Sequence, residues 1–335
     1  MTTDPADHDD AHDYGHVSTG ALPTPDEVQA LIDDTYQRFR SVSDGANSTV
    51  YPALERADTT HFGVCIAAAS GNVYEAGDAR VPFTIMSVAK PFVFALVCEQ
   101  IGARAVRDRI GVNATGLPFN SLEAIERGPG GRTNPMVNAG AIATTGLVAG
   151  ASVDERWAAV RDGLSAFAGR PLELDDEVFE SASATNHRNQ AIARLLQAEG
   201  VLTGEPHEAV DVYTRQSSLS VTAVDLAVMG ATLAGGGVNP TTGVRVVSAS
   251  TCHDVLAVMA TAGLYETSGD WLFEVGLPGK SGIGGGIVTV SPGKGGLGTY
   301  STPLDAAGNS VRGQLAARYL SRRLGLDLFV SSGAR

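Results

Sequence analysis

The chain has 335 residues, enough for one large domain or two closely packed ones whose core needs no disulfide bonds. Its net charge of −13 argues against nucleic acid or an anionic membrane as a partner, and no apolar run reaches the ~20 residues of a membrane span. The N-terminus is acidic and rich in histidine, whereas a signal peptide is basic and then apolar, so we expect a cytoplasmic protein.

Residues 1–22 lack an apolar period and are predicted to form a disordered acidic tail. Histidine recurs every four residues in this tail, a pattern that a solvated segment explains better than a metal site does. Residues 23–335 are predicted to form a single domain. At its start, Thr24 and Glu27 have capping-box spacing around Pro25, and the apolar stripe that follows predicts an amphipathic helix to about Arg40.

Strand and helix patterns divide the rest of the chain into three parts. Residues 61–69 and 73–76 flank the turn Ser70-Gly71-Asn72 and predict a hairpin, and helical periods then dominate from about residue 84 to 262. Strand patterns return at 286–290 and 298–301, before a final helix from about 310 to 324. The predicted class is α/β (α+β): a mixed sheet from residues 23–84 and 263–335, flanked by terminal helices, with an all-helical lobe at 85–262. A cleft between sheet and lobe is the natural site.

Ser87 and Lys90 stand at the start of an apolar segment and would share one face of a helix. Lysine and arginine together number 24, yet lysine occurs only at positions 90, 280 and 294. Lysine can lose its proton in a protein and arginine cannot, so a buried Lys90 could activate the Ser87 hydroxyl as a nucleophile. The alternative is a structural lysine that extends its ammonium from a core helix to solvent.

A glycine-rich stretch, residues 277–286, contains the second lysine, Lys280. A phosphate-binding loop is excluded because Glu274 stands where that motif needs glycine and a strand follows where it needs a helix. The glycines would let backbone N–H groups approach a ligand, as an oxyanion hole requires; the alternative is a flexible hairpin rim. Asn138 and Asn189 open helical segments and could bind a polar small molecule or act as caps.

Other hydrolytic and metal sites are disfavoured. No Gly-x-Ser-x-Gly motif surrounds a serine, and no histidine stands near Ser87, so a Ser-His-Asp triad is not predicted. The three cysteines are widely spaced in apolar surroundings and indicate reduced core residues. No Cys/His cluster has zinc spacing, so no metal site is predicted.

Five motifs occur in order with a sixth near the end, and together they resemble the serine-dependent glutaminases over residues 25 to 325. They are Ser87-x-x-Lys90, Asn134-Pro135-x-x-Asn138-x-Gly140-Ala141-Ile142, Arg188-Asn189-x-Ala191, Tyr213-x-Arg215-Gln216, Lys280-Ser281-Gly282 and Leu304-Asp305-x-x-Gly308-Asn309-Ser310-Val311. The resemblance implies the fold of β-lactamases and penicillin-binding proteins. It also implies hydrolysis of L-glutamine to L-glutamate and ammonia without a cofactor, in a homodimer or homotetramer.

The resemblance implies catalytic roles for four residues. Ser87 would attack the side-chain amide carbonyl with Lys90 as its base, and Tyr265 would pass the proton to the departing ammonia. The backbone N–H groups of Ser87 and Ile283 would form the oxyanion hole; the family usually has valine at 283, but a backbone donor tolerates isoleucine.

The same resemblance implies a substrate-binding set. Asn138, Asn189 and Tyr213 would hold the α-carboxylate and amide ends of the substrate. Lys280 would keep the cleft positive and help to orient Tyr265.

One departure from the family pattern bears on the substrate. The family carries a glutamate seven residues before the Arg188-Asn189 asparagine, where it pairs with the substrate's α-ammonium, and this chain has Ala182 there. Loss of such a contact costs about 1.5–3 kcal/mol. Glu180 would replace it only if the surrounding loop were shifted. Two alternatives stay open beside a glutaminase: an amidase of the same mechanism for substrates without a free α-ammonium, and a non-catalytic binding protein. A penicillin-binding enzyme is the most remote reading.

Overall fold

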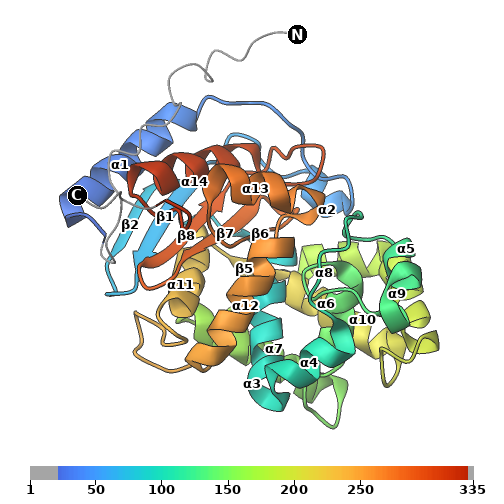
Figure 1. Ribbon diagram of the computed structural model, residues 1–335. Coiled ribbons are helices and arrows are strands. Elements are labelled where there is room, and N and C mark those ends of the chain that lie inside the picture. Colours follow the sequence, from blue (N-terminus) through green and yellow to red (C-terminus); the bar gives the residue numbers. More distant parts are fainter. Residues whose placement is uncertain (1–21, 331–335) are drawn as a thin grey trace.

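Strands from both ends of the chain pair in one five-stranded antiparallel sheet with the order β2-β1-β8-β7-β6 (Figure 1). The structure is a computed structural model that describes residues 22–330, so the predicted acidic tail lies outside the described residues except for Leu22. The strands of this sheet are β1 (Gly63–Ala68), β2 (Val73–Gly77), β6 (Gly279–Ser281), β7 (Gly286–Ser291) and β8 (Gly295–Tyr300). A smaller sheet pairs β3 (Phe83–Thr84), β5 (Leu219–Val221) and β4 (Glu173–Leu174), in that order.

Helices cover both faces of the large sheet (Figure 1). The helices that come before and after those of the lobe in the sequence are α1 (Pro25–Phe39), α2 (Pro52–Glu55), α12 (Ala249–Ala262), α13 (Ser268–Val275) and α14 (Val311–Arg323). The lobe contains η1 (Met86–Val88), α3 (Ala89–Ile101), α4 (Ala103–Ile110), α5 (Glu123–Arg127), η2 (Pro129–Gly131), α6 (Asn138–Thr145), α7 (Val153–Ala168), α8 (Asp176–Thr185), α9 (His187–Ala198), α10 (Pro206–Ser217) and α11 (Ala223–Ala234); η3 (Tyr265–Thr267) precedes α13.

Alternating side chains of the sheet feed two separate cores, because successive residues of a strand point to opposite faces. In β1, Val64 and Ile66 pack with the core under α1, α13 and α14, whereas Cys65 and Ala67 pack with the core of the helical lobe. Buried residues of α3, α6, α7, α10, α11 and α12 form most of this second core. The sheet is therefore shared by both halves of the molecule, and the halves meet along its lobe-facing side.

Glycine allows α11 to lie directly on the sheet. A Cβ added to Gly296 would lie 2.3 Å from the carbonyl oxygen of Ala227, and one added to Gly298 would lie 2.1 Å from that of Ala223. Side chains at these β8 positions would push α11 away from the sheet. The helix begins with the predicted capping box, in which Thr222 and Asp225 bond to each other's backbone.

The structure confirms the predicted class and most of the predicted elements. The helix at Pro25–Phe39 with its Thr24 capping box, the β1–β2 hairpin, the late strands and the last helix all form as expected. The three cysteines are buried and free, as predicted. Two expectations are wrong. The loop around Ala182 is helix α8, and the possible flexible rim at Lys280 is strand β6, which is buried throughout.

No single helix between residues 22 and 330 has the length and apolarity of a membrane span. The helices Met86–Ile101 and Ala103–Ile110 have that length and apolarity only when they are taken together, and the chain bends by 118° between them.

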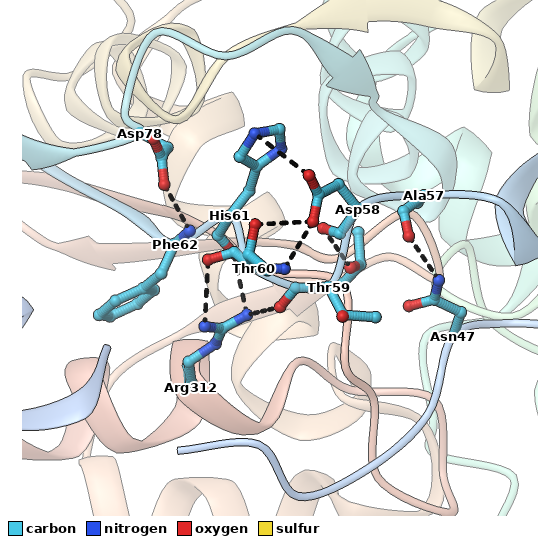
Figure 2. A network of polar contacts seen from close by, with 10 residues as sticks. Asn47, Ala57, Asp58, Thr59, Thr60, His61, Phe62, Asp78 and Arg312 are labelled. Atoms are coloured by element: carbon cyan, nitrogen blue, oxygen red, sulfur yellow. Dashed lines mark hydrogen bonds and ion pairs between the residues drawn. The ribbon is translucent and has the colours of Figure 1, made fainter. Parts of the chain in front are cut away.

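Arg312 on α14 ties the connection between α2 and β1 to the sheet (Figure 2). Its guanidinium is buried, donates to the Ser301 hydroxyl at 2.7 Å, and reaches the carbonyl oxygens of Thr59 at 2.5 Å and His61 at 3.0 Å. Asn47 extends the network by donating to the carbonyl of Ala57 at 2.7 Å. Arg312 thus satisfies backbone carbonyls of a segment that has little regular structure of its own.

We expect Arg312→Ala to lower the free energy of unfolding by about 2–4 kcal/mol, because several buried acceptors would lose their donor. Urea denaturation followed by circular dichroism measures this change. The exposed Arg109 makes no ion pair with the residues that the structure describes, so Arg109→Ala is the control and should stay within about 0.5 kcal/mol of the parent. Equal stability of Arg312→Ala and the parent would contradict a clamping role.

Candidate functional site

Ser87 lies where the helical lobe meets the sheet, as predicted. It belongs to the short helix η1 between β3 and α3, is 8% exposed and lines a cavity of about 180 Å³. Lobe residues Asn138, Asn189 and Tyr213 line the same cavity, and Ile283 from the β6–β7 connection closes it on the sheet side. The backbone before Ser87 is unusual, because Met86 has a φ of 47°, a value that residues other than glycine rarely adopt.

Lys90 lies one helical turn after Ser87 and is 2% exposed. Its Nζ donates to Oδ1 of Asn138 at 2.7 Å and to the carbonyl oxygen of Met136 at 3.3 Å. A neutral lysine amine has two N–H bonds and one lone pair. These two acceptors therefore use both N–H groups of the neutral form and leave the lone pair free to take a proton.

Burial lowers the pKa of Lys90 to about 7, since removing an ammonium from water disfavours its charged form. No carboxylate forms an ion pair with Lys90 in the described part of the chain, so nothing offsets this effect of burial. A substantial fraction of Lys90 is therefore neutral near pH 7. A lysine base needs this property.

Tyr265 and Lys280 stand behind the nucleophile. The Tyr265 hydroxyl donates to the carbonyl oxygen of Ser281 at 3.2 Å. Burial raises the pKa of Tyr265, and hydrogen bonds to the side chain of Ser87 and to Ser281 act in the opposite direction. Lys280 is fully buried, and its Nζ donates to the carbonyls of Ser281 at 2.6 Å and Gly263 at 2.8 Å and lies 4.4 Å from the Tyr265 ring centre. Burial, and then the charge of Lys90, lower the pKa of Lys280 well below its ordinary value.

Three polar side chains of the cavity form one hydrogen-bonded chain. Asn138 Nδ2 donates to Oδ1 of Asn189 at 2.9 Å, and the Tyr213 hydroxyl donates to Oδ1 of Asn138 at 3.1 Å. Because Asn138 also accepts from Lys90, the amides are linked directly to the proposed base. Asn138 begins α6, Asn189 lies in the first turn of α9, and Tyr213 lies on α10, so three lobe helices hold the chain in place.

A turn at residues 282–285 brings Ile283 against the nucleophile. A Cβ added to Gly282 would lie 3.3 Å from the backbone nitrogen of Ser87, and one added to Gly284 would lie 2.4 Å from the carbonyl of Thr84. Glycine therefore permits the close approach of residues 282–284 to the backbone at Thr84 and Ser87, which the predicted pair of N–H donors from Ser87 and Ile283 requires. An oxyanion hole has this arrangement.

Ala182 is 2% exposed and lines the cavity from helix α8. The expectation that Glu180 could replace the missing carboxylate through a shifted loop is wrong, since side chains two positions apart on a helix point about 200° apart. Glu180 is exposed and does not line the cavity. No acidic side chain within residues 22–330 lines the cavity.

Sequence reasoning missed Tyr51, Phe119 and Thr214 as cavity-lining residues and gave Asn186 no role. Tyr51 forms a hydrogen bond with the Asn189 side chain, and burial raises the pKa of Tyr51. Asn186 donates to Thr214 Oγ1 at 2.7 Å, and its own Oδ1 is buried without a partner among the described residues. Tyr51 follows an irregular segment that shows no periodicity, so the sequence contained no signal for it. The substitution of the family's usual residues at Asn186 was the available sign for that position.

The eight residues predicted for the site thus lie in one cluster: Ser87, Asn138, Asn189, Tyr213 and Ile283 line the cavity, and Lys90, Tyr265 and Lys280 lie behind it. Their individual roles stay predictions. What the arrangement offers chemically is a serine beside a buried amine, with backbone donors on one side and neutral polar groups on the other.

Known proteins place this arrangement in a family. The family model described as Glutaminase matches residues 45–329. "Glutaminase 2" of Yersinia pestis is 60% identical over 99% of this chain and 97% of its own length, and a glutaminase of Colwellia psychrerythraea is 44% identical over 92% and 99%.

Solved structures agree. The probable glutaminase ybaS has a TM-score of 0.91 at 44% identity and covers 92% of this chain and 100% of its own. A probable glutaminase from Bacillus subtilis, complexed with 6-diazo-5-oxo-L-norleucine, has a TM-score of 0.82 at 29% identity over 91% and 97%. These likenesses also establish the predicted β-lactamase-like fold. The chain belongs to the glutaminase family.

Proposed function

We propose that this protein hydrolyses L-glutamine to L-glutamate and ammonia through a Ser-Lys acyl-enzyme mechanism. The observation that carries the proposal is a cavity-lining serine followed one turn later by a buried lysine whose pKa burial lowers to about 7. Membership of the glutaminase family supports the substrate, and the clustering of all eight predicted residues supports the mechanism.

In the proposed reaction, neutral Lys90 takes the proton of the Ser87 hydroxyl as its oxygen attacks the side-chain amide carbon. The N–H groups of Ser87 and Ile283 bind the oxygen that becomes negative. Tyr265, bonded to Ser87 and Ser281, passes a proton to the departing nitrogen, which leaves as ammonia. Water then attacks the ester by the same route, releasing glutamate and restoring Ser87.

Asn138, Asn189 and Tyr213 bind the polar ends of the substrate in this proposal. Their mutual hydrogen bonds hold them in place before the substrate arrives, which reduces the ordering cost of binding. Lys280 fixes the carbonyl of Ser281 that Tyr265 also uses, and so orients the tyrosine. Cytoplasmic location, a homodimer or homotetramer, and the absence of nucleic acid or membrane partners stay predictions from the sequence.

A second candidate function is an amidase for substrates whose α-nitrogen carries no charge. The favouring observation is that Ala182 and the rest of the cavity lining provide no carboxylate for an ammonium. The buried, unpartnered Oδ1 of Asn186 could instead accept a hydrogen bond from a neutral N–H.

Ser87→Ala should lower the rate of ammonia release from L-glutamine by about four orders of magnitude or more, because the attacking oxygen is removed. A coupled glutamate dehydrogenase assay measures the release. Ser217→Ala is the matched control, since Ser217 lines the same cavity but gives its hydroxyl to the Tyr213 carbonyl at 2.8 Å. No ammonia from the parent protein at millimolar glutamine would refute the proposal, and so would full activity in Ser87→Ala.

The turnover rate should rise with pH along a limb centred at about 7, because Lys90 has a free lone pair only above its pKa. A pH profile of kcat between pH 5 and 9 is the measurement. Lys90→Arg should lose about 10²–10⁴-fold, since arginine keeps its proton throughout this range.

Lys294→Arg provides the control for the lysine exchange, because Lys294 lies on the β7–β8 turn and does not line the cavity. Lys294→Arg should keep the kcat of the parent protein and the same rise of kcat with pH. An activity that is flat from pH 5 to 9, or that survives Lys90→Arg, would exclude Lys90 as the base.

The two candidate functions differ in their response to the α-nitrogen. If the amidase is correct, N-acetyl-L-glutamine should be cleaved with a higher kcat/KM than L-glutamine, and Ala182→Glu should shift the ratio toward L-glutamine by about tenfold or more. Ala182→Gln adds a similar volume without the charge and should not produce this shift. A higher kcat/KM of the parent protein for L-glutamine than for N-acetyl-L-glutamine would support the glutaminase and contradict the amidase.

A further inference from the structure

A second cavity, here called the outer groove, adjoins the cavity of Ser87. It has a volume of about 640 Å³ and is lined mainly by residues 44–50 before α2 and 304–308 before α14. Three residues line both spaces: Val50, Phe119 and Ile283. The outer groove and the substrate cavity therefore meet at these three side chains.

The outer groove adjoins the reacting end of the substrate cavity. The shared residue Ile283 stands beside the nucleophile, whereas Ala182, Asn186 and Tyr213 at the other end do not line the groove. Gly308 belongs to the groove wall, and a Cβ there would lie 3.3 Å from Ile283 Cγ2 and 3.7 Å from Tyr265 Cε2. The ring of Phe119 lies 4.8 Å from that of Tyr265. Phe119 and Gly308 of the groove lining thus lie next to Tyr265, the residue proposed to protonate the leaving nitrogen, although Tyr265 itself does not line the groove.

The groove is held in shape by hydrogen bonds between its two walls. Ala46 and Leu304 exchange backbone hydrogen bonds of 3.0 and 2.9 Å from one wall to the other. Asn47 ties the first wall to the chain after it by donating to the carbonyls of Glu55 at 3.1 Å and Ala57 at 2.7 Å, and Figure 2 shows the bond to Ala57. These hydrogen bonds hold the walls in place. A groove that exists beforehand can bind a substituent without paying for its own ordering.

Ammonia needs far less space than the groove provides, since a molecule of the size of water occupies about 30 Å³. We propose that the site also cleaves N-alkyl amides of glutamine, with the alkylamine leaving group lying in the outer groove. This inference rests on the proposed function, because it uses the same Ser87 and Tyr265. Ser87 gives its proton to Lys90 and forms the ester as the C–N bond breaks. The nitrogen takes a proton from Tyr265 and leaves as a primary amine, the proton held by Lys90 restores Tyr265, and water then cleaves the ester to release glutamate.

The charge of the groove favours an amine with a second, distal ammonium. Asp44 and Asp305 line it, and no lysine or arginine of the described part of the chain does. Asp305 accepts from the backbone N–H groups of Ala307 and Asn309 at 2.9 Å each and from Gln314 at 2.9 Å, so its carboxylate is fixed. Asp44 is exposed at the groove. A cationic tail would meet opposite charge there.

The test compares glutamate formation from L-glutamine, N-butyl-L-glutamine and N-(4-aminobutyl)-L-glutamine, each substituted on the side-chain amide, with the freed amine quantified by chromatography. We expect both amides to be cleaved with kcat/KM within about tenfold of L-glutamine, and the aminobutyl compound to be the better of the two. Ala307→Trp, which fills the groove, should lower kcat/KM for both amides by about tenfold or more and change L-glutamine by less than about twofold.

Ala198→Trp at the exposed end of α9 is the matched control and should leave all three substrates unchanged. If Ala307→Trp does not fold, Asp44→Asn should remove the advantage of the aminobutyl over the butyl compound. Cleavage of L-glutamine with amides slower by more than about a hundredfold overturns this inference and leaves the proposed function intact. Cleavage of the amides without L-glutamine supports the groove and overturns the proposed substrate; cleavage of none overturns both.

Discussion

The site depends on an amine that the fold keeps out of water without giving it a counter-charge. Lys90 lies on a helix that is buried on nearly all sides, and within residues 22–330 its Nζ donates hydrogen bonds to the neutral oxygens of Met136 and Asn138 and to no carboxylate. A carboxylate in either place would stabilise the ammonium and raise its pKa, which would remove the base at neutral pH. We therefore infer that the segment 134–138 has two roles. It provides the neutral surroundings that keep the pKa of Lys90 low, and it binds the substrate.

Two strained residues on opposite sides of the nucleophile support this reading. Met86 and Tyr265, with φ of 47° and 55°, are the positive-φ residues other than glycine within 22–330, and each costs about 1–3 kcal/mol. Met86 sets the direction of Ser87, and Tyr265 sets the position of a hydroxyl beside it. The surrounding structure compensates: both side chains are buried in one small apolar cluster with Leu54, Ile283 and Leu304. Strain is concentrated where two reacting groups must converge, and two members of the cluster that holds it, Ile283 and Leu304, also line the outer groove.

Hydrophobic periodicity predicted the elements that have one buried and one exposed face. It did not predict the elements that are buried on several faces. The capping boxes at Thr24 and Thr222 and the hairpin turn at Gly71 are local signals, and each appears where expected. Helix α8 was missed because its mix of small and polar residues at 181–185 has the composition of a loop, and tertiary packing decided its structure. The eight site residues followed from motifs in the chain. Tyr51 and Phe119 could not be found that way, since they reach the cavity from irregular segments positioned by Arg312 and by long-range contacts.

The charges around the cavity form a pattern that bears on both ends of a substrate. Arg188 lines the cavity as a cation, and no acid lines it among the described residues, so the field in the cavity favours a carboxylate and a developing oxyanion. Acidic groups occur instead at Asp44 and Asp305, beyond Ile283 and on the side of the leaving nitrogen. A negative field at that position stabilises an amine as it gains a proton and departs. The difference in charge on the two sides of Val50, Phe119 and Ile283 thus gives the site a direction, with the acyl part of an amide on the side of Arg188 and the amine part on the side of Asp44 and Asp305.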